Sequence, residues 1–251
     1  MLFLTYHKVQ KAGVPGGGEF YTVTEPQLAA HLGTLAARKI RVGGVDDLLV
    51  GAPKPGVCAL TFDDGTADHF DVVLPALRES GVRAIFFPPT AKLDRPGYLT
   101  RPQIREIAAA GHTIGSHSHE HRRLDRMRDA EIREQLRTSI EILGELAGTP
   151  PRILAPPGGF LDERVKTIAL DLGFRAIRTM RWGLNRDLDP CALECIPMSR
   201  FVTPARFVKM LDGGGLGWFK CLYLAKEILK LLVPMNLYAR LRNSAIPNRS
   251  H

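Results

Sequence analysis

The chain has 251 residues, of which 45% are hydrophobic and 24% are charged, and its formal net charge is +8. This length can form one substantial α/β domain with a large core, and the ordinary composition excludes a mainly disordered protein. The positive charge favours an anionic partner such as a membrane surface or a phosphorylated substrate. The basic residues are scattered and are not interleaved with aromatic residues as in single-strand binders, so we expect no nucleic-acid partner.

The N-terminal sequence MLFLTYHKV has no basic segment and becomes polar after a short apolar run, so we do not expect a signal peptide. The four cysteines form no C-x-x-C pair, which argues against a structural zinc site or a disulfide framework. We therefore expect a cytoplasmic protein.

Short apolar runs alternate along the chain with helical patterns, which is typical of βα units around a parallel sheet. Strands are predicted at residues 2–6, 57–62, 82–87, 112–115, 152–154 and 174–178. Helices are predicted at residues 24–39, 68–80, 101–110, 128–147 and 162–172. The first helix has Thr24 as a cap and Pro26 at an early position, and the other four stop at a glycine. The pattern predicts an α/β fold, an incomplete or distorted (β/α) barrel.

Polar clusters follow several of these strands, at the edge where barrels carry their chemistry. Asp63, Asp64 and Gly65 follow the run 57–62, so two carboxylates lie side by side before a sharp turn. Adjacent carboxylates repel unless a dication neutralises one, which leaves the other free to accept a proton. An ordinary Asp-Asp-Gly turn with a helix cap is the alternative.

His117 and His121 are four residues apart, so in a helical turn both imidazoles would share one face, whereas His119 would point elsewhere. The alternative is a solvated histidine-rich loop. Together with Asp64, the pair predicts a site of two histidines and one carboxylate with open coordination positions, as hydrolysis requires. Zn²⁺ fits these ligands best, and Co²⁺, Ni²⁺, Mn²⁺ or Fe²⁺ would also be accepted.

These residues resemble the polysaccharide deacetylases with a NodB-homology domain, carbohydrate esterase family 4, over roughly residues 2–200. Thr-Phe-Asp-Asp-Gly at 61–65 is similar to the first motif of the family, and His-Ser-His-Glu-His at 117–121 is similar to the second. The resemblance implies a distorted barrel of the NodB type in which Asp63 is the general base. It also implies that Asp64, His117 and His121 hold the metal.

The third motif of the family, usually Arg-x-Pro-Tyr-Gly, appears here as Ala-Pro-Pro-Gly-Gly at 155–159. Ala155 stands at the arginine position, so we expect Asp63 to lack its usual orienting partner. Gly158 stands at the aromatic position, where the backbone N–H would still stabilise an oxyanion. Pro157 is expected to contact substrate.

The fourth and fifth motifs are less clear. Trp182 corresponds to a tryptophan that walls the substrate pocket, with ordinary core packing as the alternative. The Leu-x-His motif, whose histidine protonates the leaving amine, is absent after residue 190. Tyr6-His7 is similar to the Tyr-His of circularly permuted members, which implies that His7 is the general acid, although a histidine at a strand end is often structural.

The resemblance fades after about residue 200, and we expect residues 1–205 to form the barrel and residues 206–251 a helical, basic extension. Residues 218–233 form an amphipathic pattern that either packs on the barrel or lies in a membrane interface. The predicted activity is metal-dependent removal of an N-acyl group, foremost acetyl, from an amino sugar of a glycan or of its lipid- or nucleotide-linked precursor. Alternatives are a deformylase of a lipid-linked amino sugar, an O-acetyl esterase, a cyclic-amide hydrolase and an inactive carbohydrate-binding protein.

Overall fold

The computed structural model describes residues 1–14, 19–43, 56–186, 189–215 and 217. Eight strands form one sheet in the order β7-β6-β5-β1-β10-β9-β8, with β4 paired to β5 off this path. These strands are β1 (Leu2–Tyr6), β4 (Arg41–Val42), β5 (Val57–Asp63), β6 (Ile85–Phe87), β7 (Thr113–Ile114), β8 (Ile153–Leu154), β9 (Ala176–Trp182) and β10 (Leu193–Pro197). A second sheet pairs β2 (Lys8–Gln10) with β3 (Thr22–Thr24).

The strands named above pair in parallel throughout, and the sheet curls so that its two ends meet. The contact between the ends is a parallel bridge from Ser116, just after β7, to Leu154 in β8. Ser116 also donates its N–H to Ile153 and accepts from the N–H of Ala155. The predicted distorted (β/α) barrel is therefore confirmed.

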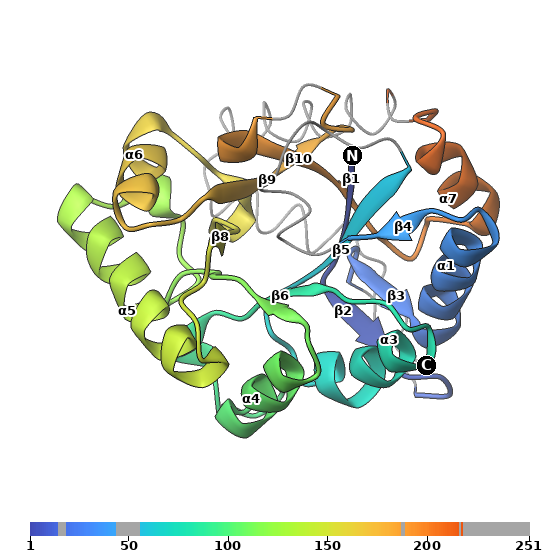
Figure 1. The fold of residues 1–251 in the computed structure, drawn as a ribbon, viewed down its shortest axis with the longest axis horizontal. Helices are drawn as coiled ribbons and strands as arrows, with labels where there is room; N and C mark the ends of the chain where they lie inside the picture. Colours follow the sequence, from blue (N-terminus) through green and yellow to red (C-terminus); the bar gives the residue numbers. More distant parts are fainter. Residues whose placement is uncertain (15–18, 44–55, 187–188, 216, 218–251) are drawn as a thin grey trace, which may run out of the picture.

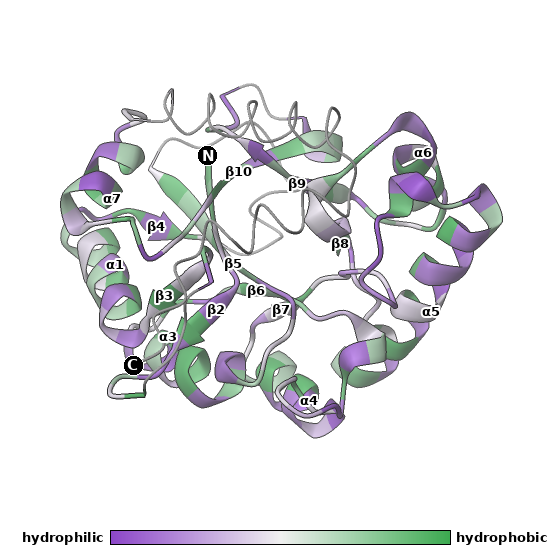
Figure 2. Cartoon of the chain, turned by 180° about the vertical axis from the view of Figure 1, so that it is seen from behind, coloured by the Kyte–Doolittle hydropathy of each residue, from purple (hydrophilic) through white to green (hydrophobic). Residues whose placement is uncertain are grey.

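Helices surround this barrel on the outside (Figure 1). They are α1 (Glu25–Ala37), α3 (Leu74–Glu79), α4 (Arg101–Ala109), α5 (Asp129–Ala147), α6 (Glu163–Asp171) and α7 (Pro204–Leu211). Short helical turns are η1 (His69–Val73), η2 (Thr90–Lys92), η3 (Leu124–Arg126), η4 (Pro157–Gly159) and η5 (Pro190–Ala192). Hydrophilic and hydrophobic bands alternate along α5 and α6 (Figure 2), as expected for helices with one face on a core.

The helix signals in the sequence act as predicted. Thr24 accepts a hydrogen bond from the N–H of Gln27 and completes a capping box at the start of α1, with Pro26 in the first turn. Gly148 adopts a left-handed conformation at the end of α5, where a residue with a side chain would be strained. The predicted helix 68–80 differs, because its first part is the π-helical turn η1.

Alternation along the strands separates an inner from an outer core. Phe3, Ala59, Phe87 and Met180 belong to a cluster inside the barrel, and their strand neighbours pack outward against the helices. On β5 the same two-residue period that turns Ala59 inward also turns Thr61 and Asp63 inward. A carboxylate therefore lies inside the barrel at its carboxyl edge.

The boundary predicted at residue 205 falls within α7. Phe207 and Met210 of this helix are in the outer core, and the ring of Phe207 stacks on His31 of α1 with centroids 4.0 Å apart. Residues 206–211 thus pack on the barrel, whereas the amphipathic pattern at 218–233 lies outside the described residues. The domain division remains a prediction. No helix in the described ranges is long and apolar enough to cross a membrane.

Candidate active site

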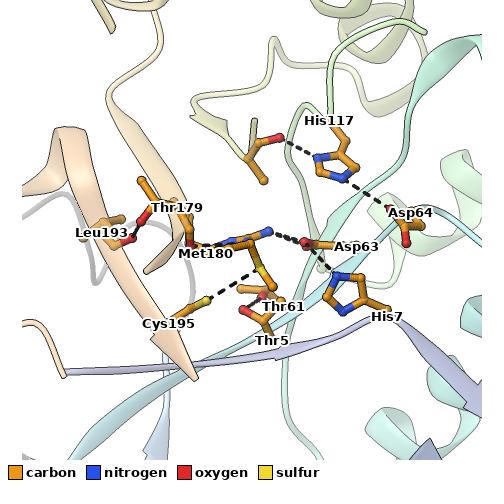
Figure 3. Close-up of polar contacts among 12 residues, drawn as sticks. Thr5, His7, Thr61, Asp63, Asp64, His117, Thr179, Met180, Leu193 and Cys195 are labelled. Atoms are coloured by element: carbon orange, nitrogen blue, oxygen red, sulfur yellow. Dashed lines mark hydrogen bonds and ion pairs between the residues drawn. The ribbon is translucent and has the colours of Figure 1, made fainter. Parts of the chain in front are cut away.

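Asp63 is the last residue of β5 and is only 2% exposed. The guanidinium of Arg178 meets it inside the barrel, with Nη2 2.5 Å from each carboxylate oxygen. Figure 3 shows Asp63 with His7 and Asp64 beside it. Arg178 is fully buried in β9, two residues after Ala176 and two before Met180, both of which face the inner core. The strand period therefore points Arg178 at Asp63 across the barrel.

This pair corrects one expectation. The substitution of Ala155 for the family's arginine does not leave Asp63 without an orienting partner, because the cation comes from β9 instead. Ala155 is fully buried in the inner cluster, so an apolar side chain fills the place at the end of β8. The sequence held one indication of this, since a charged residue at an inward position of a buried strand requires a buried partner.

His7 lies on the other side of Asp63, between β1 and β2. Its Nε2 is 3.8 Å from Oδ2 of Asp63. The backbone around it is held by η1: Nε2 of His69 donates to the carbonyl of His7 at 2.5 Å, and the N–H of Val9 donates to Asp68 at 2.7 Å. A π-helical turn beside a site is a frequent functional feature. Burial lowers the pKa of His7, and the negative charges of Asp63 and Asp64 oppose this effect.

Asp64, His117 and His121 come together beside this pair. Oδ1 of Asp64 is 3.4 Å from Nε2 of His117 and 2.9 Å from Nε2 of His121. The two histidines lie in a loop and not in the helical turn that their spacing predicts, with left-handed backbone at Ser118 (φ 60°) and His121 (φ 61°). Asp64 (φ 72°) is also left-handed. Such strained backbone collects at functional sites, where the surrounding structure stabilises it.

The donor set fits a divalent metal ion. One ligand atom from each of the three residues lies within 4.8 Å of the others. Nε2 of His121 is buried, and it faces Oδ1 of Asp64 at 2.9 Å, so the two atoms are placed to share a cation. Nδ1 of His117 donates to the carbonyl of Ala155 at 2.5 Å, which directs the lone pair of Nε2 toward Asp64.

The charges in this triad are strongly coupled. Burial alone would raise the pKa of Asp64, but hydrogen bonds from His117 and His121 hold it well below its ordinary value. Burial alone would lower the pKa of His117, yet Asp64 and Asp63 raise it. A cation that binds here must replace a proton, so we expect metal affinity to fall in acid.

The remaining predicted residues have different surroundings. Pro157 and Gly158 form the turn η4 after β8, and Gly158 has a φ of 70°, which suits glycine. Trp182, at the end of β9, is 7% exposed and belongs to the outer core. Its burial agrees with the packing alternative. Contact of Pro157 or Trp182 with substrate, and the oxyanion role of Gly158, remain predictions.

A parallel barrel with a buried carboxylate, an adjacent metal-type triad and a histidine at one edge is the arrangement of the NodB-type barrel class. A family model described as polysaccharide deacetylase matches residues 51–177. This match covers about half of the chain, and the chain belongs to the polysaccharide deacetylase family.

Curated relatives agree with this assignment. A peptidoglycan-N-acetylglucosamine deacetylase of Bacillus cereus is 32% identical over 135 residues, which cover 51% of this chain and 48% of the relative. A chitin deacetylase of Colletotrichum lindemuthianum is 30% identical over 146 residues and covers 58% of each chain. The chain thus spans about half the length of these relatives.

Solved structures show the same fold. A deacetylase of Streptococcus pyogenes in complex with acetate aligns with a TM-score of 0.77, at 18% identity, over 84% of this chain and 97% of that one. A polysaccharide deacetylase of Bacillus cereus aligns with a TM-score of 0.75, also at 18% identity, over 84% of this chain and 68% of that one. At this identity the alignments support the barrel alone.

Proposed function

We propose that the protein is a metal-dependent hydrolase that removes an N-acyl group, foremost acetyl, from an amino sugar of a glycan or of its lipid- or nucleotide-linked precursor. The observation that carries the proposal is the contact of Asp63 with Arg178 and His7 directly beside the triad of Asp64, His117 and His121. A pure binding protein would have no need for a buried carboxylate and cation at this edge, because such a pair is costly to bury.

In the proposed reaction, Asp63 accepts a proton from the water that attacks the acyl carbon. Arg178 contacts both oxygens of Asp63 and fixes the plane of the carboxylate, so the proton acceptor is already oriented. His7 lies within 3.8 Å of the same carboxylate and would donate a proton to the departing amine. The N–H of Gly158 would stabilise the oxyanion.

Asp64, His117 and His121 would hold the cation, foremost Zn²⁺. A dication bound there would polarise the acyl carbonyl and make water easier to deprotonate. His117 is fixed by its bond to the Ala155 carbonyl, so the site would favour a metal that accepts nitrogen ligands in a set orientation.

The test combines elemental analysis of the purified chain with release assays on a panel of N-acetylated, N-formylated and O-acetylated amino sugars, free and lipid-linked. Acetate release with one bound dication per chain supports the proposal. Formate release in its place would identify a deformylase, and release from O-acetyl sugars alone would identify an esterase. Bound metal without any release would favour the inactive carbohydrate-binding protein.

A further inference from the structure

Exposed aromatic rings continue outward from His7. Among the described residues, the exposed large hydrophobic side chains include Phe20 (49%) and Phe201 (46%), and these two rings contact each other with centroids 5.6 Å apart. Phe20 meets Tyr21 edge to face at 5.0 Å, and Tyr21 stacks on His7 at 4.9 Å. We refer to Phe20, Tyr21 and Phe201 as the aromatic surface.

The strand pairing explains this arrangement. β2 and β3 pair in parallel with Lys8 opposite Thr22, so the residues just before them, His7 and Tyr21, lie side by side. Phe201 follows β10, which pairs with β1. The aromatic surface is therefore assembled from two segments that both border the edge where Asp63 lies.

Hydrogen bonds and a cation–π contact hold the segment around Phe201 in place. The guanidinium of Arg206 donates to the carbonyl of Phe201 at 3.1 Å, and that of Arg200 lies over its ring, 4.8 Å from the centroid. The carbonyl of Arg200 accepts from the side chain of Gln27 at 3.2 Å, which ties the segment to α1. A fixed exposed ring loses little conformational entropy when it binds a ligand.

We propose that the aromatic surface binds a sugar ring of the glycan chain next to the residue that is hydrolysed, a proposal that rests on the function proposed above. The C–H face of a pyranose is apolar and packs on the electron-rich face of an aromatic ring. Single exposed phenylalanines need no explanation. These rings, however, contact one another and reach His7, which contacts Asp63. A half-buried Tyr21 leading into the site suits a bound chain better than a flat lipid surface.

The test uses the full chain with Phe20→Ala and Phe201→Ala combined, and N-acetylglucosamine oligomers of one and five units as substrates. We expect the ratio of kcat/KM for the pentamer to that for the monomer to fall roughly tenfold, mainly through KM, because two stacked rings are lost. Leu170→Ala is the matched control, since Leu170 is 40% exposed on α6. This control should leave the ratio unchanged.

An unchanged ratio in the double variant overturns the proposal. If the double variant keeps the wild-type ratio but has a lower melting temperature, the two rings stabilise the fold. If it keeps the ratio but no longer floats with phosphatidylglycerol vesicles as the wild type does, the two rings bind a membrane. If the wild type releases no acetate from either oligomer, binding of the pentamer is measured by calorimetry, which tests the aromatic surface independently of catalysis. Binding by the wild type that the double variant loses supports the aromatic surface, and equal or absent binding overturns it.

Discussion

Replacing Arg178 with methionine removes the cation that the structure places on Asp63. Methionine keeps an unbranched apolar side chain but has no guanidinium. The carboxylate of Asp63, which is 2% exposed, would lose the Nη2 donor that lies 2.5 Å from each of its oxygens. Loss of one partner from a buried pair costs about 3–5 kcal/mol. For a chain of this length each kcal/mol lowers the melting temperature by roughly 2–4 °C, so we expect a fall of about 10 °C.

Activity should fall as well, because an Asp63 carboxylate without the guanidinium loses its orientation. A general base contributes about 10²- to 10⁴-fold, so we expect kcat to fall by about 10²-fold or more. The assays are thermal melting and acetate release, with Arg175→Met, an exposed position just before β9, as the control. Melting and kcat of Arg178→Met that match those of the control would refute the reasoning.

Asp63→Asn should lower turnover by about 10²-fold or more while elemental analysis still finds the metal, and full activity would exclude Asp63 as the base. Asp64→Ala should lose the metal itself, and retained stoichiometric metal would contradict the proposed ligand set. His7→Gln should lower kcat more than it changes KM, with metal content intact; an effect on KM alone would argue against an acid role. Burial lowers the pKa of His31 to about 4, so as the pH falls the unfolded chain binds a proton at this residue before the folded chain does. The contribution of neutral His31 to the free energy of unfolding is therefore complete above about pH 6.5 and is lost as the pH falls toward 4. The difference amounts to about 3 kcal/mol, and urea titrations of His31→Gln should show a weaker dependence over this range.

The sequence predicted the elements and residues that depend on local chemistry. Capping by Thr24 and the stop at Gly148 are fixed by neighbouring backbone, so the helix ends follow from a few letters. The triad of Asp64, His117 and His121 was also predicted, because its members follow two strands that meet at one edge. The geometry behind the histidine pair was wrong, since two left-handed residues, and not a helix, bring the rings together.

Contacts between distant strands could not be predicted in the same way. Arg178 contacts Asp63 only because the sheet curls until β9 faces β5, and no local pattern encodes that curvature. The short strand β10 was missed, as were β2 and β3, which place Tyr21 beside His7. Each of these strands has five residues or fewer, so it offers little periodicity to recognise.

The ion pair of Asp63 and Arg178 joins positions 115 residues apart, on strands that β1 and β10 separate within the sheet. The proposed metal site and the proposed hydrolytic site would therefore require different lengths of chain. The segment matched by the family model, residues 51–177, holds all three ligand candidates but ends one residue before Arg178 and begins after His7. During folding, a cation could be captured as soon as β5 and the loop after β7 are in place. Competence for the chemical step would arrive later, when β1 and β9 bring His7 and Arg178 to Asp63.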